Sequence, residues 1–163
     1  MKRVFFDMDG VLCEYHEDAT MEDMEKDGYF RSLAPRTNML EAVKCLIASG
    51  ETEVYILSSV LPQRKEEATA EKNAWLNEHL PAIDEKHRLF PICGTDKAEA
   101  AGGVGSCDIL FDDYTVNLDL WQAAGGRAVK ILNECNGRTG RFTAGPRLKV
   151  NRPNEILEAV RAM

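Results

Sequence analysis

The sequence has little of what marks secreted, membrane-embedded or nucleic-acid-binding proteins. Its five cysteines are odd in number and form no CxxC pair, so neither a disulfide framework nor a zinc knuckle is favoured. No apolar run approaches the roughly 18 residues that a membrane span needs, and the first one already reaches an acid at Asp7, unlike a signal peptide. Acidic side chains outnumber basic ones by 27 to 20, which argues against unaided binding to long nucleic acid. We therefore expect a cytoplasmic protein with reduced thiols, no membrane association and no long nucleic-acid partner.

The pattern of apolar residues predicts strands and helices in alternation. The length of 163 residues suits one domain with a sizeable core. The predicted strands are 3–6, 53–57, 89–93, 108–111, 128–132 and a short one at 148–150. The predicted helices are 39–48, 62–80, 117–124 and 153–162. Such alternation indicates an α/β fold, a Rossmann-like three-layer arrangement in which helices cover both faces of a parallel sheet.

Residues 14–36 interrupt this alternation. The segment is polar and helix-prone, and it follows directly on the acids at the end of the first strand. We interpret it as a small helical cap inserted above the strand ends, with residues 1–13 and 37–163 forming the core domain. The alternative is a plain surface loop.

Polar side chains stand where the predicted strands end. Because ligands of parallel α/β sheets bind at the carboxyl ends of the strands, these residues should gather at one rim. They are Asp7 and Asp9 after the first strand, Ser58 and Ser59 after the second, Lys97 after the third, and Asp112 and Asp113 after the fourth.

Clustered carboxylates repel one another unless a cation lies between them. Asp7, Asp112 and a backbone carbonyl offer the hard oxygen ligands that suit magnesium, which leaves coordination positions for a phosphate oxygen. Gly10 allows a sharp turn and a close backbone approach to a ligand. Ser58 supplies a hydroxyl donor and Lys97 a positive charge, so the rim has what a transferring phosphoryl group needs.

The two acids of the first strand can divide the chemistry of such a transfer. Asp7 can attack phosphorus and form an aspartyl-phosphate. Asp9, two residues on, can protonate the leaving oxygen and then activate a water. This pattern predicts a magnesium-dependent phosphomonoesterase.

Four motifs, FFDMDGVL, YILSS, GTDK and ILFDD, occur in an order that resembles the haloacid dehalogenase-like superfamily. The likeness runs from residue 3 to about residue 132. GYFRSLAP, KNAWLNEHLP and DILFDDYTVNLDLWQAAGG further resemble the 5'(3')-deoxyribonucleotidase, cytosolic type C family. The sequence departs from that family in its shorter insert, in Ser58-Ser59 where Thr-Ser is common, and in YTVN after Asp113.

The resemblance implies a role for each matching residue. Magnesium would be held by Asp7, Asp112 and the backbone carbonyl of Asp9, with Asp7 as nucleophile and Asp9 as acid and base. The phosphate group would be held by the residues Ser58, Ser59, Lys97, Lys72 and Gly10. Phe30 would line a base pocket, and the substrate would be a nucleoside monophosphate.

Several of these residues also have plain structural interpretations. Asp112 or Asp113 can cap the following helix, Lys72 and Lys97 can be surface lysines, and Phe30 can be core packing. Two alternative functions stay open: a phosphatase for other small phosphoesters, or a non-catalytic binding module on the same fold. A homodimer is a further possibility that the short insert suggests.

Overall fold

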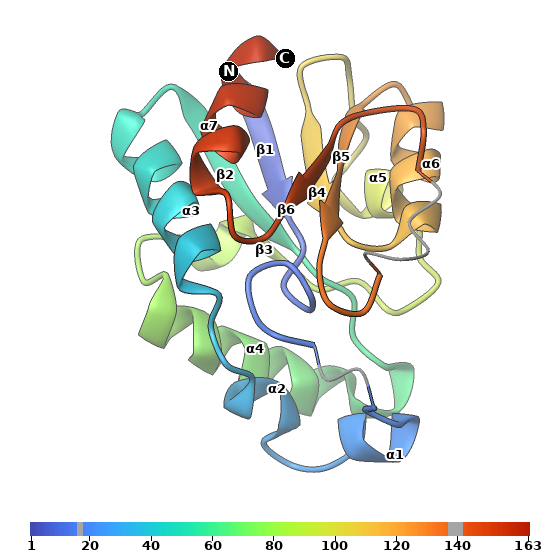
Figure 1. Ribbon diagram of the computed structural model, residues 1–163. Coiled ribbons are helices and arrows are strands. Elements are labelled where there is room, and N and C mark those ends of the chain that lie inside the picture. Colours follow the sequence, from blue (N-terminus) through green and yellow to red (C-terminus); the bar gives the residue numbers. More distant parts are fainter. Residues whose placement is uncertain (16–17, 137–141) are drawn as a thin grey trace.

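The computed structural model describes residues 1–15, 18–136 and 142–163. At its centre six parallel strands form one sheet in the order β3-β2-β1-β4-β5-β6 (Figure 1). The strands are β1 (Lys2–Phe6), β2 (Thr52–Leu57), β3 (Arg88–Leu89), β4 (Ile109–Asp112), β5 (Arg127–Leu132) and β6 (Arg147–Lys149). The predicted α/β fold with a parallel sheet is confirmed.

The order of the strands reverses at the centre of the sheet. From β1 the chain moves to β2 and β3 on one side, and then returns to place β4, β5 and β6 on the other. Strands β1 and β4 are therefore neighbours whose following loops diverge, which opens a crevice at their carboxyl ends. This is where the sequence places its acids.

Helices cover both faces of the sheet (Figure 1). One face is covered by α3 (Thr37–Ser49), α4 (Lys65–His79) and α7 (Pro153–Ala162), and the other by α5 (Lys97–Ala100) and α6 (Thr115–Ala123). Short 3₁₀ turns, η1 (Pro62–Arg64) and η2 (Glu85–His87), precede α4 and β3. In the part of the chain described, no helix is both long enough and apolar enough to cross a membrane.

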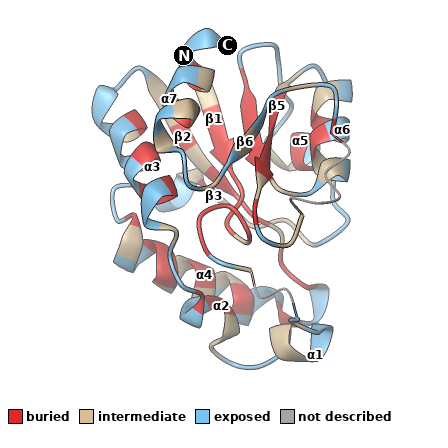
Figure 2. Cartoon of the chain, in the orientation of Figure 1, coloured by how far each residue is buried: buried red, intermediate tan, exposed pale blue. Residues whose placement is uncertain are grey.

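The apolar core has two parts, one on each side of the sheet. Val4 and Phe6 of β1 face the side of α3, α4 and α7, whereas Phe5 faces α5 and α6. Side chains of a strand alternate between its two faces, so a sheet covered on both faces buries side chains of either orientation. Trp75 and Trp121 are fully buried on opposite sides, as expected for helix-to-sheet packing. Figure 2 shows buried residues along the central strands of the sheet and on the helix faces turned toward it.

The third strand is shorter than predicted. We expected residues 89–93, but β3 covers only Arg88–Leu89. Pro91 has no N–H to donate to the ladder, and the chain continues through an isolated bridge between Val60 and Ile92. The position of β3 at the edge of the sheet agrees with the proline.

Two helices of four residues each, α1 (Met21–Met24) and α2 (Tyr29–Ser32), lie within the segment 14–36. They sit beyond the carboxyl ends of the strands, and α2 packs against α4 (Figure 1). Residues 16 and 17 of the segment lie outside the described residues. The segment therefore stands over the rim of the sheet where the acids gather.

Candidate active site

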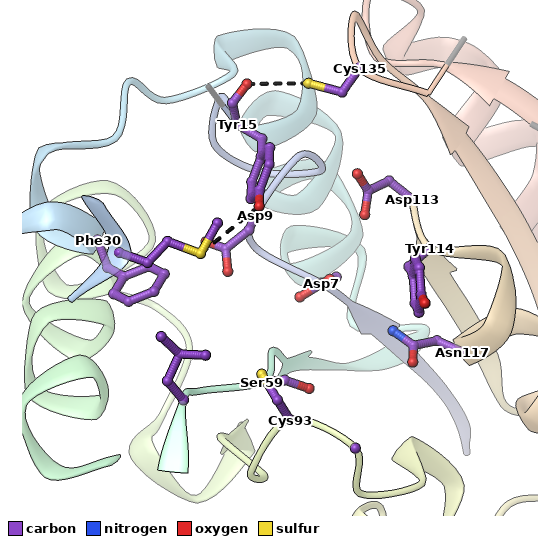
Figure 3. A pocket seen from close by; sticks show the side chains of 13 residues that line it. Asp7, Asp9, Tyr15, Phe30, Ser59, Cys93, Asp113, Tyr114, Asn117 and Cys135 are labelled. Carbon is purple, nitrogen blue, oxygen red and sulfur yellow. Dashed lines mark hydrogen bonds between the residues drawn. The ribbon is translucent and has the colours of Figure 1, made fainter. Parts of the chain in front are cut away.

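The sheet register brings Asp7 and Asp112 together. Phe6 of β1 pairs with Phe111 of β4, and the Asp7 amide donates to the Phe111 carbonyl at 3.0 Å. Asp7 therefore directly follows β1, and Asp112 is the last residue of the neighbouring parallel strand β4. Both residues stand at the reversal of strand order, where the loops part. Figure 3 shows Asp7 at the end of its strand.

A buried lysine joins these two carboxylates. Lys97 Nζ lies 2.6 Å from Asp112 Oδ2 and 3.2 Å from Asp7 Oδ2. Its side chain is only 1% exposed, so it is not a surface lysine. Burial alone would lower the pKa of Lys97, but the charges of Asp112 and Asp7 outweigh it and raise the pKa. Lys97 therefore carries a fixed positive charge at the floor of the site.

A second buried lysine holds the end of β2 against the loop after β1. Lys72 Nζ donates to Asp9 Oδ2 at 2.6 Å, to Ser58 Oγ at 2.8 Å and to the Ser59 carbonyl at 3.0 Å. Its side chain is fully buried, although it lies on the long helix α4. All three donors of the ammonium group are used, so Lys72 fixes the positions of both the acid and the hydroxyl.

The carboxylate of Asp9 is bound by Lys72 and is not one of the grouped carboxylates at the strand ends. Burial raises its pKa, against the opposing charge of Lys72. The Cys13 thiol also points to it, with Sγ 3.8 Å from Asp9 Oδ1. A carboxyl group with a raised pKa is suited to proton transfer near neutral pH.

Three carboxylates form a possible cation site. Asp7, Asp112 and Asp113 bring one oxygen each within 4.8 Å of one another. Burial, followed by the charges of Asp112 and Asp7, raises the pKa of Asp113 to about 7. Crowded carboxylate oxygens are the donors that a hard divalent cation takes, so this set fits magnesium.

The three carboxylates of this group differ in how far protein donors already occupy their oxygens and in whether they line the cavity. Asp112 accepts from the Tyr114 amide at 2.7 Å and from Asn117 Nδ2 at 3.0 Å in addition to Lys97, and it is fully buried. Asp7 and Asp113 are the members that line the open cavity. Asp112 therefore supports the group from behind, while the other two face the solvent side.

Gly10 leaves the space in which Asp113 sits. A Cβ on this residue would lie 2.3 Å from Asp113 Oδ2 and 2.7 Å from Asn133 Nδ2, and its φ is +76°. Asn133 Nδ2 donates to the Gly10 carbonyl at 2.9 Å and to Asp113 Oδ2 at 2.8 Å. The Gly10 amide itself donates to the Cys13 carbonyl. Close packing of the two loops thus accounts for this glycine.

A cavity of about 400 Å³ opens above the acids (Figure 3). Asp7, Asp9 and Asp113 form its polar part, and Ser59 rather than the buried Ser58 reaches its wall. The remaining wall is largely apolar or aromatic and includes Tyr15, Met24, Phe30, Leu61 and Tyr114. Phe30 is both part of the core and part of this wall, and its ring centre lies 4.7 Å from Lys72 Nζ.

The structure brings together every residue that the sequence singled out. Asp113 joins the grouped carboxylates, while the carboxylate of Asp9 does not. Asp113 also does not cap α6, because the N-cap residue of that helix, Tyr114, has no side-chain cap bond. Asn117 and Asn133 were not predicted as site residues from the sequence. Asn133 directly follows β5, so the strand-end rule that found the acids could have found it.

A family model described as "5' nucleotidase, deoxy (Pyrimidine), cytosolic type C protein" matches residues 15–142. Two curated relatives from Staphylococcus epidermidis, provisionally named 5'(3')-deoxyribonucleotidase, are each 26% identical over 127 residues, which is 78% of this chain. The match spans 63% of the length of those relatives.

Solved structures with a similar fold have low sequence identity. A D,D-heptose 1,7-bisphosphate phosphatase from B. bronchiseptica, solved with magnesium and phosphate, has a TM-score of 0.66 at 14% identity, covering 98% of this chain and 99% of that one. A haloacid dehalogenase-like family protein from Streptococcus pneumoniae has a TM-score of 0.61 at 10% identity, covering 98% of each chain. These likenesses concern the fold alone.

Proposed function

The chain belongs to the cytosolic type C 5'-nucleotidase family, and we propose that it is a magnesium-dependent phosphomonoesterase of the haloacid dehalogenase-like superfamily that acts on nucleoside monophosphates. The observation that carries this proposal is the group of Asp7, Asp112 and Asp113 around one point, backed by Lys97. Such a group is costly to bury unless a cation and an anionic ligand complete it.

In the first step Asp7 acts as the nucleophile. One of its carboxylate oxygens attacks phosphorus, the bond from phosphorus to the ester oxygen breaks, and an aspartyl-phosphate forms. The leaving oxygen takes the proton of Asp9, whose raised pKa favours the protonated form that this step needs. Lys97, in contact with Asp7, offers its positive charge to the phosphoryl oxygens.

In the second step water releases the phosphate. Asp9, now ionised, takes a proton from the water as its oxygen attacks phosphorus, and the bond to Asp7 breaks. Phosphate leaves and both acids return to their starting states. Asp7, Asp113 and Asp112, together with the backbone carbonyl of Asp9, would hold magnesium, which would supply positive charge against the phosphoryl oxygens.

The phosphate contacts are divided between an open wall and a buried support. Ser59 reaches the cavity wall, whereas Ser58 accepts a hydrogen bond from Lys72 behind it. Lys72 uses its three donors within the protein, so it affects the phosphate indirectly, by fixing the positions of Asp9 and of the end of β2. Lys97, buried beside Asp7 and Asp112, then supplies positive charge from beneath the floor, and the cation site supplies it at the floor itself.

The wall of the cavity favours a substrate with an aromatic or apolar part. Tyr15, Phe30 and Tyr114 stand around a polar floor of carboxylates. A nucleoside monophosphate would place its phosphate on that floor and its base against these rings. The small insert, with two helices of four residues, is the feature that favours the alternative of a phosphatase for other small phosphoesters.

A substrate panel tests the proposal. Phosphate release would be measured from ribo- and deoxyribonucleoside 5'- and 3'-monophosphates beside sugar phosphates, with magnesium and with EDTA. Magnesium-dependent release that favours nucleotides is the expected result. Release from all esters alike would favour the broader phosphatase, and magnesium binding without any release would favour a non-catalytic binding module.

A further inference from the structure

A buried ion pair outside the phosphate site holds the inserted segment onto α4. Arg64, the last residue of η1, and Glu71 of α4 lie 3.2 Å apart between Nη2 and Oε1. Their side chains are only 11% and 12% exposed. Long charged side chains are rarely buried this far unless they bind something specific, and here both bind the backbone of the segment 14–36.

The contacts of the pair are concentrated on one turn between α1 and α2. Glu71 accepts the amide of Gly28 at 2.9 Å through Oε1 and the amide of Phe30 at 3.0 Å through Oε2. Arg64 donates to the Lys26 carbonyl at 2.6 Å and to Asp27 Oδ1 at 2.7 Å. Four hydrogen bonds within five residues of the chain thus fix the turn, two from Glu71 and two from Arg64.

This turn depends on the pair because α2 is too short to hold itself. A helix of four residues is far below the length at which helices are stable in water. Its N-cap residue, Gly28, has no side chain and a φ of +80°, so the free amides at the start of α2 need an acceptor from elsewhere. Glu71 supplies that acceptor from a long helix of the core domain.

The same turn of α4 also organises the phosphate site. Lys72, the residue after Glu71, holds Asp9 and lies 4.7 Å from the centre of the Phe30 ring. The backbone of Phe30 is therefore held by Glu71, and its ring faces Lys72. Two adjacent residues of one helix thus place the acid and the aromatic wall relative to each other.

We propose that Arg64 and Glu71 are a positioning pair that fixes Phe30 on the cavity wall and so sets how tightly the leaving group of the substrate is held. The inference rests on the proposed function, because it concerns the nucleoside side of the same cavity. Neither residue touches the phosphate floor, so the pair should affect the selectivity between substrates more than the chemistry of phosphoryl transfer.

The test compares Glu71→Gln with Glu67→Gln. Glu67 stands one turn earlier on α4, is exposed, and loses the same charge when replaced. Glu71→Gln puts an NH₂ group where one of the two amides donates and removes the charge facing Arg64. We expect the Gly28 and Phe30 amides to exchange hydrogen faster in Glu71→Gln than in the wild type. In Glu67→Gln the exchange of both amides should stay at the wild-type rate.

Kinetics of two substrates separate positioning from a general structural effect. A nucleoside monophosphate and acetyl phosphate, which has no aromatic part, would be compared at saturating magnesium. We expect kcat/KM for the nucleotide to fall on the order of tenfold relative to that for acetyl phosphate, mainly through a higher KM. A variant with less folded enzyme would lose kcat on both substrates in equal proportion.

The outcomes are distinguishable from failure of the proposed function. A wild type that releases phosphate from acetyl phosphate but from no nucleotide would refute the proposed substrate class. A wild type active on nucleotides, whose preference for them is unchanged by Glu71→Gln, would refute the positioning pair alone. Unchanged exchange at Gly28 and Phe30 in that variant would refute it as well.

Discussion

Acidic and basic side chains meet at both ends of the central strands, but in different proportions. We call the end where the strands begin the amino edge and the end where they finish the carboxyl edge. At the amino edge Arg3 binds Asp108 one to one, through Nε to Oδ1 at 2.9 Å and Nη2 to Oδ2 at 2.6 Å. At the carboxyl edge three buried lysines stand beside four acids, Asp7, Asp9, Asp112 and Asp113. Lys72 and Lys97 pair with carboxylates of this group, and Lys130 donates to the Asp113 carbonyl.

The balanced pair and the unbalanced group have different consequences. Charges that are matched and hydrogen-bonded contribute to folding, whereas an excess of buried carboxylates costs stability. The excess of carboxylates at the carboxyl edge persists because the strand ends hold these acids in place. Their uncompensated negative charge favours binding of a cation. Substitutions at the two edges should therefore act in opposite ways on activity and on stability.

Neutralising Asp7 should give the largest effect on activity. Asp7→Asn removes the proposed nucleophile, and we expect phosphate release to fall by more than about 10⁴-fold. The melting temperature should not fall, because one of the crowded charges is gone and Lys97 keeps its contact with Asp112. Activity assays and circular dichroism check the two parts. Undiminished turnover would contradict the mechanism.

Adding and removing magnesium should show the demand for a cation directly. EDTA should abolish turnover, and magnesium at about 100 times its Kd should raise the free energy of unfolding by about 2.7 kcal/mol. Thermal unfolding with and without the metal measures this without any substrate. In Asp113→Asn the stabilisation should be much smaller; an equal rise in that variant would exclude Asp113 from the site.

A methyl group at Gly10 should disturb the carboxyl edge through sterics rather than charge. Gly50→Ala is the matched control, because Gly50 also has a positive φ of +64° but nothing within 4 Å of an added Cβ. We expect about 1 kcal/mol of destabilisation from the backbone strain at either position. Gly10→Ala should cost a further 1–3 kcal/mol or so through overpacking against Asp113.

Urea unfolding measures that difference between the two alanine variants. Activity and magnesium binding should fall in Gly10→Ala only, since Asp113 has to move away from the added methyl group. Equal stability of the two variants would show that the loops at Gly10 and Asn133 are not tightly packed.

The amino edge should give the smallest effect, and only on stability. Asp108→Asn breaks the pair with Arg3, and we expect a loss of about 1–2 kcal/mol with unchanged turnover per folded molecule. Burial alone would raise the pKa of Asp108, but the hydrogen-bonded Arg3 guanidinium holds this pKa below its usual value. The carboxylate of Asp108 therefore contributes its full stabilisation above the pKa that it has in the unfolded chain. This contribution to the free energy of unfolding is lost as the pH falls through the lower pKa of the folded protein.

Urea unfolding of wild type and Asp108→Asn across pH measures this contribution. The difference in unfolding free energy should be constant from pH 7 to about 4, near the unfolded pKa of an aspartate, and shrink below it. A difference that grows as the pH falls would contradict the assignment of the pair.

The chain order of strands, helices and polar strand ends was readable from the sequence, because each depends on local patterns. Alternating apolar runs predicted the parallel sheet, and the strand-end rule predicted that Asp7 and Asp112 lie at one rim. The end of the third strand was predicted wrongly: residues 89–93 were expected, but β3 ends at Leu89. Pro91 has no N–H group and so cannot donate the hydrogen bond that would continue the ladder.

Only the tertiary structure decided which of these side chains contact one another. The direction of the Asp9 carboxylate toward Lys72, the membership of Asp113 in the acid group, and the bridge from Asn133 to Gly10 all join residues distant in sequence. So does the hold of Arg64 and Glu71 on the turn before α2. Local sequence patterns carry periodicity along the chain, whereas such contacts depend on side-chain directions that packing of the whole fold sets.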